Sequence, residues 1–250
     1  MAGMELVIED AKFFKSCIDA VVNLVDEGIF RISPSGMHLR TMDPSQIAMV
    51  DFNLPKEAFS KLEVEGEATI GVSLVDLSKI LSRTRGGEKL AMSVDEKASR
   101  LVLEFTGESK RHFKLPLLDL NAGLPKEPKI PFDSNAVLFG GAFKEMLKDA
   151  GLLSSHVILE ARDGEFIVEA HGDSGDLRIE SKKGGALKEI KAGSASKAMF
   201  PFEYLEDMTR ACPDDAELQV FLKTDAPVRI SYQIGKAGLS YYLAPRVETV

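Results

Sequence analysis

The sequence predicts an α+β fold built from two similar domains, and three observations support it. Short segments of alternating apolar and polar residues, which are typical of strands, occur along the whole chain. Four other segments carry apolar residues three and four positions apart, which is typical of amphipathic helices. The order of these segments repeats once, with a proline-rich stretch between the copies. A repeated order of this kind indicates a duplicated domain.

The strand candidates are short and are separated by turns rich in Gly and Asp, such as 162–165 and 171–176. They are Ile29 to Ile32, Met37 to Arg40, Ala48 to Leu54, Leu101 to Phe105, His112 to Leu117, Phe166 to Ala170, Leu177 to Ser181, Leu218 to Leu222, Val228 to Ile234 and Leu239 to Leu243.

The four helix candidates each carry a single apolar stripe, which a helix buries against a core. The stripes are Phe14, Cys17, Ile18, Val21 and Leu24; Leu74, Leu77, Ile80 and Leu81; Phe143, Met146, Leu147 and Ala150; and Phe202, Leu205, Met208 and Cys212. Pro201 and Pro213 flank the last segment, at positions where proline starts or stops a helix.

The duplication is visible in matched positions. Phe14 of the first helix corresponds to Phe143 of the third, and Leu77 of the second corresponds at nearly the same offset to Leu205 of the fourth. Between the halves, Leu118–Asp133 contains three prolines, so neither a helix nor a central strand can continue through it. The predicted organisation is therefore an N-terminal domain at 1–117, an extended connector at 118–133 and a C-terminal domain at 134–250.

Composition limits the possible functions. The apolar runs are far shorter than the roughly 18 to 20 residues that a membrane-spanning helix needs, so no membrane partner is expected. Acidic residues occupy the N-terminal region where a secretory signal would carry positive charge, so we expect the protein to stay inside the cell. The two cysteines, Cys17 and Cys212, lie among apolar neighbours and are expected to be buried free thiols. The net charge of −8 disfavours nucleic acid as a partner, unless basic residues gather on one surface.

Four local motifs resemble one family, the DNA sliding clamps of the proliferating-cell nuclear antigen type. These are YYLAPRVE at 241–248, MDPSQIAMVDFNL at 42–54, IGVSLVDLSKIL at 70–81 and the proline-rich connector. The resemblance covers essentially the whole chain. It implies two DNA-clamp domains per chain, with outer β-sheets and four inner helices, in a trimeric ring around duplex DNA. A compact chain of 250 residues has a radius of gyration of roughly 18 Å, comparable to the duplex width, so one chain cannot enclose DNA.

In this family the ring closes where an edge strand of one domain pairs with an edge strand of a neighbouring subunit. Carried onto this sequence, those strands are Lys110 to Leu117 and Gly175 to Lys183. The resemblance places in the interface Lys110, Phe113, Leu115, Leu177 and Ile179. Each apolar position among them would equally suit an ordinary sheet core. The ring has identical subunits in one interpretation; in the alternative, the chain is a specialised paralogue that works only inside a heterotrimeric ring.

The polar faces of the helix candidates carry cations that the resemblance turns toward DNA. They are Lys12, Lys15, Lys79, Arg83, Arg85, Lys144, Lys148 and Arg210. Contacts of this kind reach phosphates and read no sequence. Without the resemblance, the same residues are simply solvated, and the fourth helix weakens the pattern with Glu203, Glu206 and Asp207. The acidic excess, Asp214 included, is expected on outer strands and loops.

Partners of this family insert a short peptide into an apolar pocket beneath the connector. The matching positions are Met42, Ile47, Met49, Leu124, Pro227, Tyr242, Ala244 and Pro245. Ile47 and Met49 would also suit a domain core. The resemblance implies as partners a clamp loader and, through such peptides, DNA polymerase, flap endonuclease and ligase. It places the protein in the cytoplasm of an archaeon, on the nucleoid, or in a eukaryotic nucleus.

The main alternative class of function is that the protein is an enzyme. The GDSG segment at 172–175 is similar to the nucleophile region of chymotrypsin-like proteases, but it lies between two strands and has no matching histidine segment. The four histidines and two cysteines lack metal-ligand spacing, and no phosphate-binding glycine loop is present. The sequence predicts no catalytic residue, no metal and no cofactor.

Overall fold

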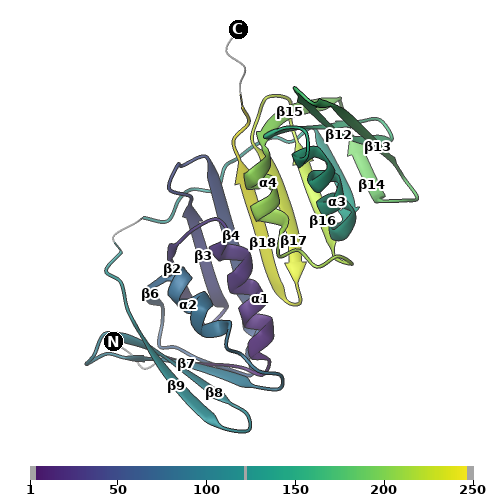
Figure 1. The fold of residues 1–250 in the computed structure, drawn as a ribbon. Helices are drawn as coiled ribbons and strands as arrows, with labels where there is room; N and C mark the ends of the chain where they lie inside the picture. Colours follow the sequence, from purple (N-terminus) through teal and green to yellow (C-terminus); the bar gives the residue numbers. More distant parts are fainter. Residues whose placement is uncertain (1–3, 121–122, 247–250) are drawn as a thin grey trace. The chain divides into compact units, whose positions relative to one another are not determined.

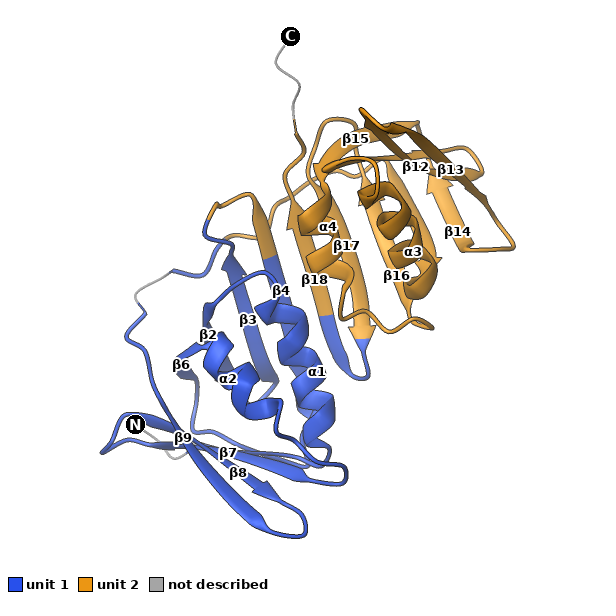
Figure 2. Cartoon of the chain, in the orientation of Figure 1, with its two compact units in different colours: residues 1–44, 50–125, 234–238 blue, residues 45–49, 126–233, 239–250 orange. Residues whose placement is uncertain are grey.

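The computed structural model describes residues 4–120 and 123–246, and it divides the chain into two compact units. Unit 1 comprises residues 1–44, 50–125 and 234–238, and unit 2 comprises residues 45–49, 126–233 and 239–250 (Figures 1 and 2). Within the described residues four α-helices lie among antiparallel strands. The predicted α+β fold is confirmed.

The first half of the chain runs β1 (Glu5–Ile8), α1 (Ala11–Val22), β2 (Glu27–Ser33), β3 (Gly36–Met42), β4 (Ala48–Pro55), a 3₁₀ turn (Lys56–Ala58), β5 (Lys61–Glu63), β6 (Ala68–Ser73), α2 (Leu74–Leu81), β7 (Lys89–Asp95), β8 (Arg100–Thr106) and β9 (Lys110–Pro116). Strands β5, β1, β7, β8 and β9 are neighbours in that order, as are β4, β3, β2 and β6. Asp10 caps α1 by accepting a hydrogen bond from the amide of Lys12, and Ser73 caps α2.

The second half runs β10 (Ser134–Phe139), α3 (Gly140–Gly151), β11 (His156–Arg162), β12 (Glu165–Gly172), β13 (Gly175–Lys182), β14 (Leu187–Ala192), β15 (Ser196–Pro201), α4 (Phe202–Thr209), β16 (Glu217–Leu222), β17 (Val228–Ile234) and β18 (Ala237–Leu243). Strands β14, β10, β16, β17 and β18 are neighbours in that order, as are β13, β12, β11 and β15.

The two halves share one topology. Apart from the 3₁₀ turn, each runs strand, helix, five strands, helix, three strands, and corresponding strands occupy corresponding places in the sheets. The duplication predicted from matched helix positions is therefore confirmed. The predicted apolar stripes are buried except at Ile80 and Phe202, which are half-buried, and Phe14 and Phe143 lie at equivalent positions, both 1% exposed or less.

Close packing explains two glycines, Gly151 at the end of α3 and Gly172 at the end of β12. A β-carbon on Gly151 would lie 2.4 Å from the ring of Phe202, so a larger residue would separate α3 from α4. A β-carbon on Gly172 would lie 1.8 Å from the main-chain oxygen of Leu153, so the segment after α3 rests directly on the end of β12. These contacts fix the end of α3 against the β12–β13 hairpin.

Candidate functional surfaces

The predicted interface residues lie on two strands that each end a sheet. Strand β9 is last in the order β5-β1-β7-β8-β9, and β13 is first in the order β13-β12-β11-β15. Along β13, Leu177 and Ile179 are half-buried on one face and alternate with exposed charged residues. Strand β9 presents Phe113 half-buried and Lys110 exposed, and Lys110 lies 3.1 Å from Glu104. An edge strand of this kind offers unpaired main-chain groups to another chain.

Leu115 lies mainly in the core of unit 1. It is only 5% exposed and pairs in register with Leu101 of β8. Phe113, its neighbour on the same face, packs edge-to-face on Phe105 with ring centres 5.7 Å apart. The guanidinium of Arg111 lies over both rings, 5.1 Å from the centre of Phe105. The core of unit 1 thus fixes the inner face of β9.

The sequence did not single out Leu152, whose side chain is 80% exposed. It caps the C-terminal end of α3, and its neighbour Leu153 contacts Gly172 at the β12–β13 hairpin. A single exposed leucine is common on protein surfaces, but this one lies beside β13, an edge strand with which another chain can pair. Leu152 lies two positions beyond Ala150, off the periodic apolar stripe of its helix, so the spacing does not mark it.

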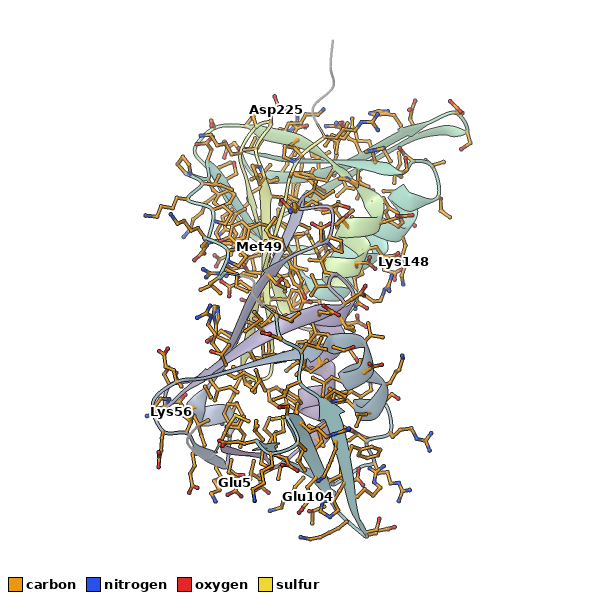
Figure 3. All side chains as sticks on the ribbon, turned by 90° about the vertical axis from the view of Figure 1, so that its left-hand side faces the viewer. Glu5, Met49, Lys56, Glu104, Lys148 and Asp225 are labelled. Atoms are coloured by element: carbon orange, nitrogen blue, oxygen red, sulfur yellow. The ribbon has the colours of Figure 1, made fainter. Side chains whose placement is uncertain are left out.

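The structure separates the eight predicted DNA-facing cations into two groups. Five have acidic partners: Lys15 with Asp19, Lys79 with Asp76 at 3.1 Å, Lys144 with Asp214 at 2.6 Å, Lys148 with Glu145 at 2.7 Å and Arg210 with Asp207 at 2.8 Å. Lys148 is labelled in Figure 3, where it extends from α3. For Lys12, Arg83 and Arg85, the part of the chain that the structure describes supplies no ion pair, and all three side chains are exposed. The unpaired cations all belong to unit 1.

The three unpaired cations lie close together. The Nζ of Lys12 is 3.7 Å from the position that a β-carbon on Gly86 would occupy, so Lys12 reaches the loop that carries Arg83 and Arg85. The amide of Ala11 donates to the oxygen of Glu88, which joins the start of α1 to the end of the same loop. Figure 1 shows α1 and α2 side by side in unit 1. We call Lys12, Arg83 and Arg85 the free cation cluster.

Lys144 is the least exposed of the five cations that have acidic partners. Its Nζ donates to the main-chain oxygen of Cys212 at 2.8 Å, and its side chain is only 21% exposed. Asp214, expected on an outer strand or loop, lies in the loop after α4 and accepts from Lys144, and this hydrogen bond lowers the pKa of Asp214. The physical reason is local: the amide of Gly141 donates to the oxygen of Asp214, so the loop after α4 is held against the start of α3.

Six of the eight predicted pocket residues belong to unit 2, whereas Met42 and Leu124 belong to unit 1. Leu124 is 41% exposed, and Met49 is buried at 2%. Ile47, Pro227, Ala244 and Pro245 are half-buried. The amide of Ala244 donates to the oxygen of Ile47 at 2.8 Å, which joins the segment before β4 to the C-terminal tail. Val247 and Glu248 of the tail motif lie outside the described residues.

Glu127 is a connector residue that the sequence did not single out. Its Oε1 accepts a hydrogen bond from the hydroxyl of Tyr242 at 2.6 Å. Burial of Tyr242, followed by this hydrogen bond, raises the pKa of the phenol. The bond therefore links the connector to β18 through two residues of unit 2.

The GDSG segment, the cysteines and the histidine side chains were considered above as possible catalytic or metal-binding groups. The segment 172–175 forms the turn between β12 and β13, with Gly172 opposite Gly175 in the register. No group of three or more His, Cys, Asp or Glu side chains suited to a metal occurs among residues 4–120 and 123–246. Both cysteines are buried free thiols, as predicted, and burial raises the pKa of each to about 12. None of the helices in the described regions is long and apolar enough to cross a membrane.

Comparison with known proteins identifies the family. Residues 3–123 match the N-terminal domain of proliferating cell nuclear antigen, and residues 126–247 match its C-terminal domain. The chain is 34% identical to the DNA polymerase sliding clamp of Thermococcus sibiricus over 98% of both chains. It is 35% identical to that of Methanococcus maripaludis, over 94% of this chain and 96% of the relative.

Solved structures agree. The fold matches proliferating cell nuclear antigen from Thermococcus kodakaraensis with a TM-score of 0.92 and 29% identity, over 97% of this chain and 100% of that one. It also matches the A. fulgidus protein, determined with the C-terminal region of FEN-1 bound, with a TM-score of 0.90 and 27% identity, over 99% and 100% of the two chains. With both of its domains matched and curated relatives aligned along nearly its whole length, the chain belongs to the proliferating cell nuclear antigen family.

Proposed function

We propose that three copies of this chain close a ring around duplex DNA. Family and relatives make the chain a DNA polymerase sliding clamp and a platform for partner proteins. The observation that carries the ring proposal is the shared topology of the two halves, in which β9 and β13 each end a sheet. Pairing β9 of one copy with β13 of the next covers both edges, and repeating a head-to-tail contact closes a ring.

Side chains beside these strands supply an apolar contact. Phe113 on β9 and Leu177 and Ile179 on β13 are half-buried in the isolated chain. Leu152 stands next to the β12–β13 hairpin with most of its surface exposed. Covering these four side chains stabilises the contact by roughly 25 cal/mol for each Å² removed from water.

The contact with DNA is electrostatic and independent of sequence. The free cation cluster of Lys12, Arg83 and Arg85 supplies unpaired charges for phosphates. The five paired cations contribute less, because each must exchange an acidic side chain for a phosphate. The net charge of −8 is compatible with this function, because a closed ring is retained by topology and needs little net attraction.

Recruitment uses the C-terminal tail and the connector. The A. fulgidus structure holds the C-terminal region of FEN-1 on a clamp of the same fold. In this chain we assign the equivalent site to the eight predicted pocket residues. Half-buried and exposed apolar positions there accept side chains of several partners, for which flexible Met is well suited. Clamp loader, DNA polymerase, flap endonuclease and ligase are the expected partners.

Loading onto DNA tests the proposed function directly. The purified chain is loaded with a clamp loader onto nicked circular DNA, and its release is compared with release after the circle is cut once. We expect slow release from circles and rapid release from linear DNA, because only an open end lets a ring slide off. Equal release from both would refute encirclement. Light scattering on the chain alone gives the mass, and a monomer that forms rings only with companion chains would identify a specialised paralogue.

A further inference from the structure

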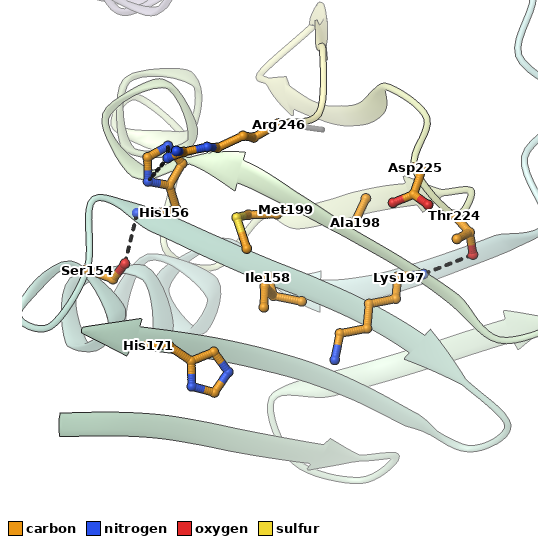
Figure 4. A pocket seen from close by; sticks show the side chains of 10 residues that line it. All are labelled: Ser154, His156, Ile158, His171, Lys197, Ala198, Met199, Thr224, Asp225 and Arg246. Atoms are coloured by element: carbon orange, nitrogen blue, oxygen red, sulfur yellow. Dashed lines mark hydrogen bonds between the residues drawn. The ribbon is translucent and has the colours of Figure 1, made fainter. Parts of the chain in front are cut away.

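Unit 2 carries a groove that the proposed clamp function does not use (Figure 4). It has a volume of about 720 Å³ and lies on β11 and β15. Its floor is apolar and contains Ile158 and Met199, which are opposite each other in the register of the two strands. Their chain neighbours Val157 and Phe200 are fully buried, so the groove lies on the face turned away from the core. None of the eight proposed peptide-pocket residues lines it.

Two main-chain contacts hold the walls of the groove on β15. The amide of Asp225 donates to the oxygen of Lys197 at 3.2 Å, and the amide of Arg246 donates to the oxygen of Met199 at 2.8 Å. The amide of Lys197 donates in turn to the hydroxyl of Thr224. The outer edge of β15 is therefore occupied at these positions, and a ligand must contact side chains rather than add a strand.

One end of the groove presents a guanidinium without an acidic partner. Arg246 Nη1 lies 2.7 Å from Nε2 of His156, and no carboxylate in the described part of the chain forms an ion pair with Arg246. Ser155 Oγ lies 3.0 Å from Nδ1 of the same ring. Nη1 also lies 3.0 Å from Nδ1, so in the neutral imidazole the ring nitrogen without a proton accepts from Arg246, whereas an imidazolium offers no acceptor. Burial and the guanidinium lower the pKa of His156, so the neutral form is favoured.

The other basic side chains of the groove already have acidic partners. Lys197 Nζ lies 2.8 Å from Glu169, and His171 Nδ1 lies 2.7 Å from Asp176. At the opposite end of the groove from Arg246, Asp225 stands on a turn with a φ of 51°, and none of the cations described in the structure pairs with it. Figure 4 shows the side chain of Arg246 directed toward His156 and away from Asp225. The groove therefore offers one open cation and one open anion, separated by an apolar floor.

We propose that this groove is a second docking site, which binds an extended segment of a partner protein through three side chains. A carboxylate contacts Arg246, an apolar side chain rests on Ile158 and Met199, and a basic side chain contacts Asp225. The walls are attached to β15 two residues apart, which corresponds to about 7 Å of extended chain, so a few consecutive residues span them. A free anion would satisfy Arg246 alone and leave the floor and Asp225 uncovered. Arg–carboxylate pairing also supplies directional specificity.

Blocked peptides test this site on the intact protein. The probes are acetyl-Glu-Leu-Ala-Lys-amide and the reversed order acetyl-Lys-Leu-Ala-Glu-amide, because the groove does not fix the chain direction. Binding is followed by amide chemical shifts of the ¹⁵N-labelled protein. We expect one order to shift the amides of β11, β15 and residues 224–225. Shifts at none of these positions with either peptide would overturn the proposal.

Variants separate the site from general charge effects. Arg246→Ala is expected to weaken binding about tenfold, the loss of one charge-assisted contact. It keeps the main-chain bond to Met199, so the tail stays in place. Asp225→Asn is expected to weaken binding to a similar extent, whereas Lys191→Ala, an exposed cation on β14, should have no effect. A peptide with Gln in place of Glu should bind weakly to the unmodified protein. Its affinity for the Arg246→Ala variant should be no lower, because the contact is already lost. Equal binding by Arg246→Ala and the unmodified chain, or shifts produced equally by inorganic phosphate, would refute the peptide site.

Discussion

Arg111 forms a two-pronged ion pair with Glu88: its Nη2 lies 2.8 Å from Oε1 and 2.6 Å from Oε2. This pair joins edge strand β9 to the loop that carries Arg83 and Arg85. Glu88 is 3% exposed, and its Oε2 also accepts from the amide of Arg85. Burial alone would raise the pKa of Glu88, but the Arg85 amide and Arg111 outweigh it, so the pKa is lowered. One carboxylate thus connects the proposed subunit contact with the proposed DNA contact.

Glu88→Ala should destabilise unit 1 by about 3 kcal/mol, because it leaves the guanidinium of Arg111 partly buried without a partner. The nitrogen Nε of Arg111 is already without a hydrogen bond, so other groups cannot readily replace Glu88. Urea unfolding measures the change. Glu65→Ala removes an exposed carboxylate and should change the free energy of unfolding by less than about 0.5 kcal/mol. Identical midpoints for the two variants would show that the pair contributes nothing to stability.

The free cation cluster should carry most of the contact with DNA. The variant with Lys12, Arg83 and Arg85 all replaced by Ala should bind DNA weakly and with a smaller dependence on salt, since each phosphate contact contributes about 0.9 to the logarithmic slope. The matched variant replaces Lys144, Lys148 and Arg210, which have acidic partners. It removes the same formal charge and should change affinity and slope less.

Fluorescence anisotropy of labelled duplex DNA across a salt series measures both quantities. Equal losses in the two variants would show that intramolecular ion pairs do not limit which cations reach phosphate. A larger loss in the second variant would assign the contact to unit 2.

Leu152→Glu should disrupt the trimer, because it places an unpaired carboxylate in an apolar contact beside the β12–β13 hairpin. Leu152→Met keeps the volume and the apolar character and should leave the trimer intact. Light scattering after gel filtration gives the mass of each variant. A trimer that survives Leu152→Glu would exclude this residue from the interface, and circular dichroism of the same samples would show whether each variant is folded.

Leu124→Ala combined with Pro245→Ala should abolish binding of a clamp-binding peptide that carries one glutamine and two aromatic residues. Truncating residues that anchor a ligand removes most of the binding energy, and Leu124 offers 41% of its surface to solvent. Phe139→Ala removes a similarly exposed side chain, 38%, and should leave peptide affinity unchanged. Titration calorimetry measures the affinities, and gel filtration should give the same mass for all variants. Unchanged affinity in the double variant would exclude this pocket.

The sequence predicted the fold well because the fold depends on patterns within short segments. The apolar stripes that contain Phe14 and Leu77 and their repeats at Phe143 and Leu205 located the helices, and their matching offsets indicated the duplication. Pairing between charged side chains could not be predicted in the same way. Lys144 and Lys12 both occupy polar positions of a helix, but only the folded chain brings Asp214 to Lys144. Leu152 was missed because periodicity identifies buried positions and gives no signal for an apolar residue left exposed.

The contact between His156 and Arg246 should weaken as the pH falls. Burial, and then the guanidinium, lower the pKa of His156 below 6.5, so the unfolded or released state binds the proton more readily than the folded state. The contribution of this contact to the free energy of unfolding is complete above pH 6.5. It is lost as the pH falls from 6.5 through the lowered pKa. The C-terminal tail at Arg246, held on β15 by its amide, should loosen over the same interval.

Carbon-13 shifts of the imidazole measure the titration. Arg246→Ala should raise the pKa of His156 only partly, because burial remains, whereas Arg162→Ala at the other end of β11 should leave it unchanged. A pKa for His156 at or above 6.5 in the unmodified chain would contradict the neutral contact.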